Sequence, residues 1–208
     1  MTTLNEHQLR TAHFVASVLL SYPDHALDEA RPLLTEAVAT LPYGEVRRRL
    51  AAFLRHLDVT LPAALAAHYV AMFDVERRCS PYLTYYAYGE TRERGAALLR
   101  FKHALRAGGF ELADGELPDH VAVVCELSGR GAVKQAVRLL QESRAGLELL
   151  RTALEEEGSP YTDVVAAVTA TLPPASARHR ETALRLVTSG PPAGEVGLEP
   201  FAGTGDDR

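Results

Sequence analysis

Apolar residues recur at every third or fourth position along most of this chain, which is the spacing of an amphipathic helix. The stripe from Leu9 to Leu19 follows Asn5 and Gln8, which have the spacing of a capping box. Another stripe contains Pro32, and we expect that helix to break or restart there because proline lacks a donor and clashes with the preceding turn. The helices predicted in this way occupy residues 5–20, 24–41 with the break at Pro32, 46–57, 60–73, 91–107, 118–129, 133–154, 159–172 and 177–188.

No alternating pattern of the kind that predicts β-strands stands out in the sequence, and we find no internal repeat. From Gly190 onward the chain loses its periodicity and becomes rich in glycine and proline, which is typical of disordered segments. We therefore predict an all-α protein. It would be a single-domain bundle of roughly eight helices over residues 1–189, followed by a disordered tail over residues 190–208.

Composition places the chain among ordinary globular proteins, because 47% of its 208 residues are hydrophobic and 24% are charged. No apolar run approaches the roughly 20 residues that a membrane-spanning helix needs. The stretch Phe14–Leu20 comes closest to a signal-peptide core, but it lacks a basic leader, so we expect no export. Cys79 and Cys125 form no Cys-x-x-Cys pair and are interpreted as reduced thiols, which indicates a cytoplasmic protein.

The charge balance argues against general binding to nucleic acids, because the formal net charge is −5. Arg47–Arg49 is the only dense basic cluster, and its place within a helical pattern favours a solvated helix face. A mildly acidic surface would instead suit a partner segment that carries arginine or lysine.

The histidines do not fit the metal sites of helical bundles. A di-iron bundle needs a glutamate three residues before a histidine, and none of the eight histidines has one. The sequence also lacks a His-Glu-x-x-His motif, zinc-site spacing, a P-loop and a Gly-x-Ser-x-Gly arrangement. His120 and Cys125 are the only conceivable base and nucleophile, but on a helix they would point about 140° apart. We therefore predict no enzymatic activity, no resident metal or cofactor, and a core position for Cys125.

Half of the eight tyrosines lie between Tyr82 and Tyr88, where a loop runs into the charged start of a helix. Aromatic rings and fixed charges at such a junction favour a binding surface. Tyrosine suits a groove because its ring is apolar and its tip is polar. The same four rings could also belong to the core, and the sequence leaves both interpretations open.

The helix predicted over residues 91–107 begins with positively charged residues, which are unfavourable at the start of a helix. Arg92 and Arg94 lie in the first turn, where a positive charge meets the positive end of the helix dipole. Arginines at these positions indicate either a ligand or an ion pair with Glu90, Glu93 or the acidic residues around position 118 that are described next. Gly95 costs about 1 kcal/mol relative to alanine within a helix, and the close approach of another backbone would account for it.

A second group of charged residues surrounds the predicted start of the helix at residue 118. On a helix, Asp119 and Glu126 would lie within about 20° of the same face, with Glu116 just before them. This acidic ridge could hold a basic side chain, or Asp119 could merely complement the dipole of its own helix. His120 could change charge near neutral pH or serve as a satisfied structural group.

These motifs together resemble the NarJ-type assembly chaperones of respiratory nitrate reductase, and the resemblance extends roughly over residues 10–155. The segments that carry it are Leu-Ser-Tyr-Pro-Asp at 20–24, Tyr-Val-Ala-Met-Phe-Asp at 69–74, Tyr-Leu-Thr-Tyr-Tyr-Ala-Tyr-Gly-Glu-Thr-Arg-Glu-Arg-Gly-Ala-Ala-Leu-Leu at 82–99, Phe-Glu-Leu at 110–112 and Glu-Leu-Pro-Asp-His at 116–120. Glu126 follows the last of these at a spacing that is also NarJ-like.

The resemblance implies an all-helical cytoplasmic chaperone that binds the N-terminal segment of the molybdenum-containing catalytic subunit. Such a chaperone keeps the apoenzyme competent for insertion of the molybdenum cofactor and delays its docking to the membrane. The cofactor is inserted into the client, so we expect none to be held stably here. We expect a monomer or a weak dimer. The alternative is a helical protein-interaction adaptor that has no molybdoenzyme client.

Under this hypothesis the client peptide lies in a groove with an apolar and a charged side. Arg92 and Arg94 would shape the site or meet acidic groups of the client. The residues assigned to the apolar side are Tyr82, Tyr85, Tyr86 and Phe101, and those assigned to the charged side are Asp119, His120 and Glu126.

Overall fold

The computed structural model describes residues 4–112, 115–177, 181–182 and 184–186. Within these residues the secondary structure is helical, apart from one isolated β-bridge between Tyr82 and His120. The all-α prediction is therefore confirmed, with more than the roughly eight helices expected. The elements are α1 (Glu6–Leu19), α2 (His25–Thr40), α3 (Glu45–Val59), α4 (Pro62–Val70), the π-helical turn η1 (Ala71–Val75), the 3₁₀ turn η2 (Arg77–Cys79), α5 (Tyr85–Tyr88), α6 (Arg92–Ala107), α7 (Val121–Gly129), α8 (Val133–Glu142), α9 (Arg144–Glu156) and α10 (Tyr161–Thr171).

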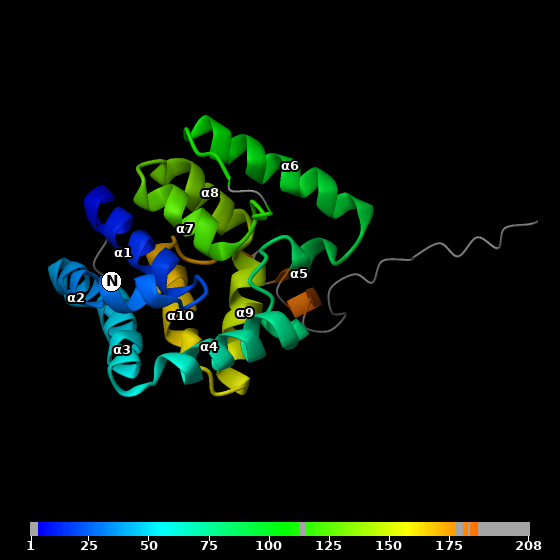
Figure 1. Cartoon of the computed structure of the whole chain (residues 1–208). Coiled ribbons are helices and arrows are strands. Elements are labelled where there is room, and N and C mark those ends of the chain that lie inside the picture. The colour runs from blue at the N-terminus through cyan, green and yellow to red at the C-terminus, as the bar shows by residue number, and fades with distance from the viewer. Residues whose placement is uncertain (1–3, 113–114, 178–180, 183, 187–208) are drawn as a thin grey trace, which may run out of the picture.

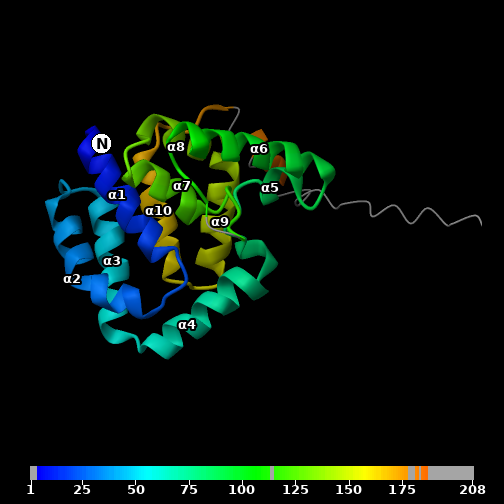
Figure 2. The same cartoon turned by 45° about the horizontal axis from the view of Figure 1, so that its top comes forward.

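Helix α10 lies at the centre of the arrangement, between α1 and α3 on one side and α9 on the other (Figure 1). Helix α1 also packs along α7, and α2 covers the outer side of α1 and α3. Helix α6 lies at the opposite edge from α2, against α5 and α8, and this position is clear in both views (Figure 2). One long face of α6 is therefore left at the surface.

An aromatic cluster joins α3, α4, η1 and α10. Its centre is Tyr161, which is buried, and the rings of Phe53 and Phe73 lie 4.8 and 4.9 Å from it, centroid to centroid. Tyr69 packs edge-on against Tyr161 at 5.8 Å. Contacts of this kind add to the free energy gained by burying apolar area. The cluster fixes where α4 lies, and with it the position of Tyr69 beside the site described below.

His13 connects three helices in the core. Its Nδ1 lies 2.7 Å from the Ser128 hydroxyl of α7, and its Nε2 lies 2.7 Å from the Thr171 hydroxyl of α10. Thr171 donates its own proton to the Val168 carbonyl oxygen, so it accepts from Nε2–H, and Nδ1 accepts from Ser128. Burial lowers the pKa of His13 to about 4, which keeps this ring neutral at pH 7.

Two of the predicted helices differ from the structure in their interior. Helix α2 runs through Pro32 without a break, because Pro32 and Asp28 both lie on the solvent-exposed face, where water can reach the carbonyl that loses its donor. The predicted helix over residues 133–154 is divided at Ser143 into α8 and α9. Arg144 is the first residue of α9, and its side chain is buried. It donates a hydrogen bond to the Pro173 carbonyl oxygen at 2.5 Å.

Both cysteines are free and buried, as expected for reduced thiols. Cys125 is completely inaccessible, which confirms its predicted place in the core, and burial raises the pKa of its thiol to about 12. Among the described residues, no helix is both long enough and apolar enough to cross a membrane. The last predicted helix is helical where it is described, at 177, 181–182 and 184–186, and the predicted tail lies outside the described residues.

Candidate functional site

Two motifs that are almost forty residues apart in the sequence meet in a short antiparallel crossing. The Leu83 amide donates to the Asp119 carbonyl oxygen at 2.9 Å, and the Val121 amide donates to the Pro81 carbonyl oxygen at 3.0 Å. Tyr82 and His120 face each other between these two hydrogen bonds. The segment that starts the tyrosine run is therefore held against the segment that precedes α7.

Helix α7 begins at Val121, three residues later than predicted. The ring of His120 provides the cap, because its Nδ1 accepts a hydrogen bond from the Ala122 amide at 3.1 Å. Asp119 lies before the helix, where its backbone takes part in the crossing. The structural interpretation of His120 is thus confirmed, and burial lowers the pKa of its ring to about 4.

Asp119 is the centre of a buried polar network that holds the tyrosine segment in place. Its carboxylate is completely inaccessible and accepts hydrogen bonds from the Thr84 amide at 3.1 Å and the Thr84 hydroxyl at 2.5 Å. The Arg94 Nε donates to the Thr84 hydroxyl at 3.1 Å, and its Nη2 lies 3.7 Å from Asp119 Oδ2. This ion pair explains why an arginine occupies the first turn of α6, as one of the sequence interpretations proposed.

The predicted acidic ridge is wrong. Asp119 and Glu126 would share a face only if the helix began before Asp119, and the crossing prevents this. Asp119 points inward, where a surface-bound peptide cannot reach it in this conformation. Glu126 does lie at the surface of α7, with 31% of its side chain exposed, and it pairs with Arg130 at 2.6 Å.

The aromatic residues assigned to the apolar surface divide into core and surface positions. Tyr86 is buried, and its hydroxyl lies 2.9 Å from the Arg78 carbonyl oxygen and 3.0 Å from that of Ser80. Phe101 is also buried and belongs to the hydrophobic core. Their assignment to an exposed surface was wrong, because their neighbours in the core cover them. Tyr85 is half-buried beside Tyr86, at 5.7 Å between ring centroids.

Tyr82 is half-buried and lines a groove of about 260 Å³, which we call the tyrosine groove. Its ring packs edge-on against His120 at 5.4 Å, and the Arg94 guanidinium lies 5.7 Å from its centroid. Burial, followed by the charge of Asp119, raises the pKa of the Tyr82 hydroxyl, so this groove wall is uncharged at neutral pH. The lining residues used below are Tyr22, Tyr69, Tyr82, Leu117, His120 and Glu126.

Tyr22 and Tyr69 are groove residues that the sequence reasoning missed. Tyr22 follows α1, is 54% exposed and packs edge-on against Tyr69 at 5.5 Å. The hydroxyl of Tyr69 donates to the Leu20 carbonyl oxygen at 3.1 Å, which fixes this ring from α4 against the end of α1. Both tyrosines lie in segments that carry the family resemblance, and that signal could have identified them.

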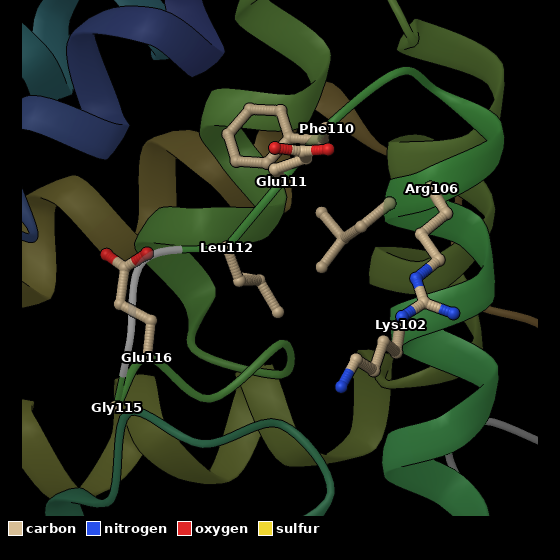
Figure 3. Close-up of a pocket in the computed structure, with 8 residues that line it drawn as sticks. Lys102, Arg106, Phe110, Glu111, Leu112, Gly115 and Glu116 are labelled. Carbon is tan, nitrogen blue, oxygen red and sulfur yellow. The ribbon is translucent and has the colours of Figure 1, made fainter.

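A second hollow, which we call the α6 cavity, has a volume of about 540 Å³ and lies between α6 and residues 110–112 and 115–116 (Figure 3). Lys102 and Arg106 extend from α6 on one side, and Leu112 and Glu116 lie across from them. Glu116 lines both hollows, so they adjoin. Arg92, by contrast, is exposed in the first turn of α6 and lines neither.

The site is suited to recognising a peptide. Three tyrosine rings and Leu117 offer apolar contact, the phenol hydroxyls offer polar tips, and Glu126 can accept charge-assisted hydrogen bonds from a basic side chain. His120 serves as a neutral wall and helix cap. The described residues therefore define an all-helical protein whose surface carries a groove lined by aromatic rings and a carboxylate.

Comparison with known proteins places this architecture in a family. A family model described as nitrate reductase delta subunit matches residues 40–167. The chain is 30% identical over 156 residues to the probable nitrate reductase molybdenum cofactor assembly chaperone NarJ of Bacillus subtilis (strain 168), which covers 75% of this chain and 85% of that protein. It is 33% identical over 150 residues to the nitrate reductase molybdenum cofactor assembly chaperone NarJ of Escherichia coli (strain K12), over 71% of this chain and 63% of that protein.

A further relative has a different size. The nitrate reductase-like protein NarX of Mycobacterium tuberculosis (strain ATCC 25618 / H37Rv) is 36% identical over 154 residues, which are 74% of this chain but only 23% of that protein. This chain belongs to the family of nitrate reductase delta subunits and NarJ-type molybdenum cofactor assembly chaperones. The relatives that carry the NarJ name are described as chaperones and not as catalysts.

Proposed function

We propose that the chain is a cytoplasmic, system-specific chaperone for the catalytic subunit of a respiratory nitrate reductase. It binds the N-terminal segment of that subunit and keeps the apoenzyme competent for insertion of the molybdenum cofactor. Release then allows the loaded enzyme to dock at the membrane. The cofactor enters the client and is not held by the chaperone, which performs no catalysis. The names of the NarJ relatives support the chaperone role.

The observation that carries the proposal is the crossing of Tyr82 with His120. It brings together two of the motifs of the family resemblance and makes both of them walls of the tyrosine groove. A residue pair that served only the core would not leave Tyr82 half-exposed beside Tyr22, which is 54% exposed. Exposed rings that line a concave surface favour binding of a partner.

The groove suits an amphipathic helix with one basic side chain near its apolar stripe. Apolar side chains of the client would lie against Tyr22, Tyr69 and Tyr82. A client arginine or lysine would take the place of Arg130 at the Glu126 carboxylate, which is already held in an ion pair. Exchange of one ion pair for another costs little, so this contact would give specificity while still permitting release.

Isothermal titration with a synthetic peptide of the client N-terminus tests this assignment. We expect Tyr82→Ala to weaken binding about tenfold or more, since buried tyrosines are common hot spots, and Glu126→Gln to weaken it severalfold. Tyr43→Ala is the matched control, because Tyr43 is 85% exposed and does not line the groove. Wild-type affinity in folded Tyr82→Ala and Glu126→Gln variants would remove the tyrosine groove as the client site. Asp119 is not a suitable test position because it is buried.

Co-purification from cells starved of molybdenum tests the chaperone role itself. The apoenzyme should accumulate in complex with the chain under these conditions and leave it when molybdate is restored. If the catalytic subunit does not associate with the chain in either condition, the alternative of a helical adaptor with no molybdoenzyme client would be favoured.

A further inference from the structure

Helix α6 carries positive charge for which the described residues provide few partners. The helix has five arginine or lysine residues and one acidic residue, in a chain whose formal net charge is −5. Most arginines elsewhere in the described chain have a carboxylate within 4 Å, including Arg31, Arg78 and Arg151. On α6 only Arg94 has such a carboxylate among the described residues. The other basic side chains of α6 can therefore bind an acidic ligand.

The α6 cavity places two of these cations beside apolar side chains. Lys102 and Arg106 extend from α6 toward the hollow, and Leu112 lies across from them (Figure 3). A carboxylate near α6 would meet both cations, and the guanidinium could bind it through two hydrogen bonds. Glu111 and Glu116 line the other side of the cavity, so they direct the carboxylates of a ligand toward α6. The cavity therefore suits a segment that combines carboxylates with apolar side chains.

The chain itself contains a segment of this composition. Residues 187–208 have four acidic residues and one basic residue, Arg208. Within them, Glu-Val-Gly-Leu-Glu-Pro-Phe at 195–201 combines two glutamates with three large apolar residues. The charge of this segment is opposite to that of α6, and its apolar side chains match the apolar lining of the α6 cavity.

The described part of the chain brings this segment close to α6. Leu186 lines a small hollow together with Arg100 and Phe101 of α6, and it packs against the hydrophobic core. Arg100 and Lys102 lie about 160° apart on the helix, so a path between them around a helix about 10–12 Å wide is on the order of 20 Å long. The chain from Leu186 to Glu195 spans up to about 30 Å when it is extended. Glu195 can therefore reach the α6 cavity without any change in the described structure.

Two other occupants fit this surface less well. A lipid surface would need an apolar face, and Leu99 is the only large apolar side chain of α6 that is exposed. A separate acidic protein lacks the advantage of covalent attachment. A short linker raises the effective concentration of a tethered segment to the order of mM, so even a weak contact would be occupied.

We propose that residues 195–201 bind in the α6 cavity of their own chain. Glu195 and Glu199 pair with Lys102 and Arg106, and the apolar side chains of the segment lie against the apolar lining of the cavity. The segment is then an intramolecular ligand, which covers a basic surface that would otherwise attract other acidic proteins.

The bound segment lies at the edge of the tyrosine groove, because Glu116 lines both hollows. The contact itself does not depend on the identity of the client. The composition that predicts disorder for residues 190–208 is compatible with it, since disordered segments can become ordered when they bind.

Nitroxide labelling of the full chain tests this contact. Cys79 and Cys125 are the two cysteines of the chain and are completely buried, so the variant Thr204→Cys offers one accessible thiol for the label. When the segment is bound, the label lies near α6 and should remove most of the intensity of the Lys102 and Arg106 amide signals in an NMR spectrum. Added salt should restore much of this intensity, because ions screen exposed charges.

Charge reversal separates a specific contact from chance approach. In the labelled chain, Lys102→Glu/Arg106→Glu should return the amide signals of α6 to the intensity that they have when the nitroxide is reduced. Adding Glu195→Lys/Glu199→Lys to this variant should bring back the loss of intensity, because the charges are then exchanged between the two partners.

The matched control is Arg48→Glu/Arg55→Glu, which makes the same change of charge on an exposed face of α3. This variant should leave the loss of intensity at α6 unchanged. A smaller loss in the control would mean that net charge alone holds the segment near the protein, and this would overturn the specific contact.

Three further results would overturn the proposal. The α6 signals would keep their full intensity in the labelled chain, or they would lose intensity equally in the charge-reversal variant. In a mixed sample, a labelled copy would reduce the α6 signals of a second, isotope-labelled copy to the same extent, which would assign the cavity to the segment of another copy. None of these results depends on client binding, so each leaves the proposed function untouched.

Discussion

Acid should destabilise this protein through His13, which is buried and neutral between Ser128 and Thr171. In the folded state burial lowers the pKa of this histidine from 6.5 to about 4. Between these two values the unfolded chain binds a proton that the folded chain does not. The free energy of unfolding therefore falls as the pH falls from about 6.5 toward 4, and the stability is fully present above this window.

The size of this loss of stability follows from the shift in the pKa of His13. With pKa values of 6.5 and about 4, lowering the pH from about 7 to about 5 removes roughly 2 kcal/mol of stability through His13. His120, whose pKa burial also lowers to about 4, contributes a similar amount. Together these losses are a large part of the roughly 5–15 kcal/mol that stabilises a typical domain.

Urea unfolding followed by circular dichroism at several pH values between about 5 and 7 measures this dependence. His13→Gln replaces the titrating ring with an amide that can still form hydrogen bonds. We expect the pH dependence of this variant to be smaller by the roughly 2 kcal/mol that His13 contributes, whatever its stability at pH 7. His25→Gln is the matched control, because it makes the same substitution at a ring that is 86% exposed.

The result that would refute this reasoning is a folded His13→Gln variant with the same change in unfolding free energy between pH 7 and pH 5 as wild type. Such a result would mean that His13 is protonated as readily in the core as in the unfolded chain. Water would then have to reach the space between α1, α7 and α10, which the complete burial of His13 excludes.

Two further predictions concern the tyrosine segment and α6. Thr84→Val removes the hydroxyl that donates to the Asp119 carboxylate and accepts from Arg94. We expect urea unfolding to show that the free energy of unfolding falls by about 2–3 kcal/mol. Wild-type stability in this variant would mean that the network contributes little. Gly95→Ala adds a methyl group in open space within a helix and should raise the free energy of unfolding by up to about 1 kcal/mol. Calorimetry would contradict this second prediction if the melting temperature fell.

The tyrosine run reaches the groove at Tyr82, but the sequence did not separate its core residues from its surface residues. The sequence places four rings between Tyr82 and Tyr88, and every one of them fits either a groove or a core. The fold leaves Tyr82 at the groove, whereas Gly146 lies so close to Tyr86 that a Cβ there would be 3.0 Å from the Tyr86 ring. Close packing of this kind depends on α9, which is about sixty residues away in the chain.

By itself the sequence determined the helices, the core position of Cys125 and the family motifs, because helical periodicity and capping are local properties of neighbouring residues. Only the tertiary structure decided that Asp119 is buried against Thr84 and Arg94, while Glu126 remains at the surface. The crossing at His120 delays the start of α7 to Val121, which leaves Asp119 outside the helix and off the face that carries Glu126. A contact between segments so far apart in the chain follows from how the helices pack, which no local pattern records.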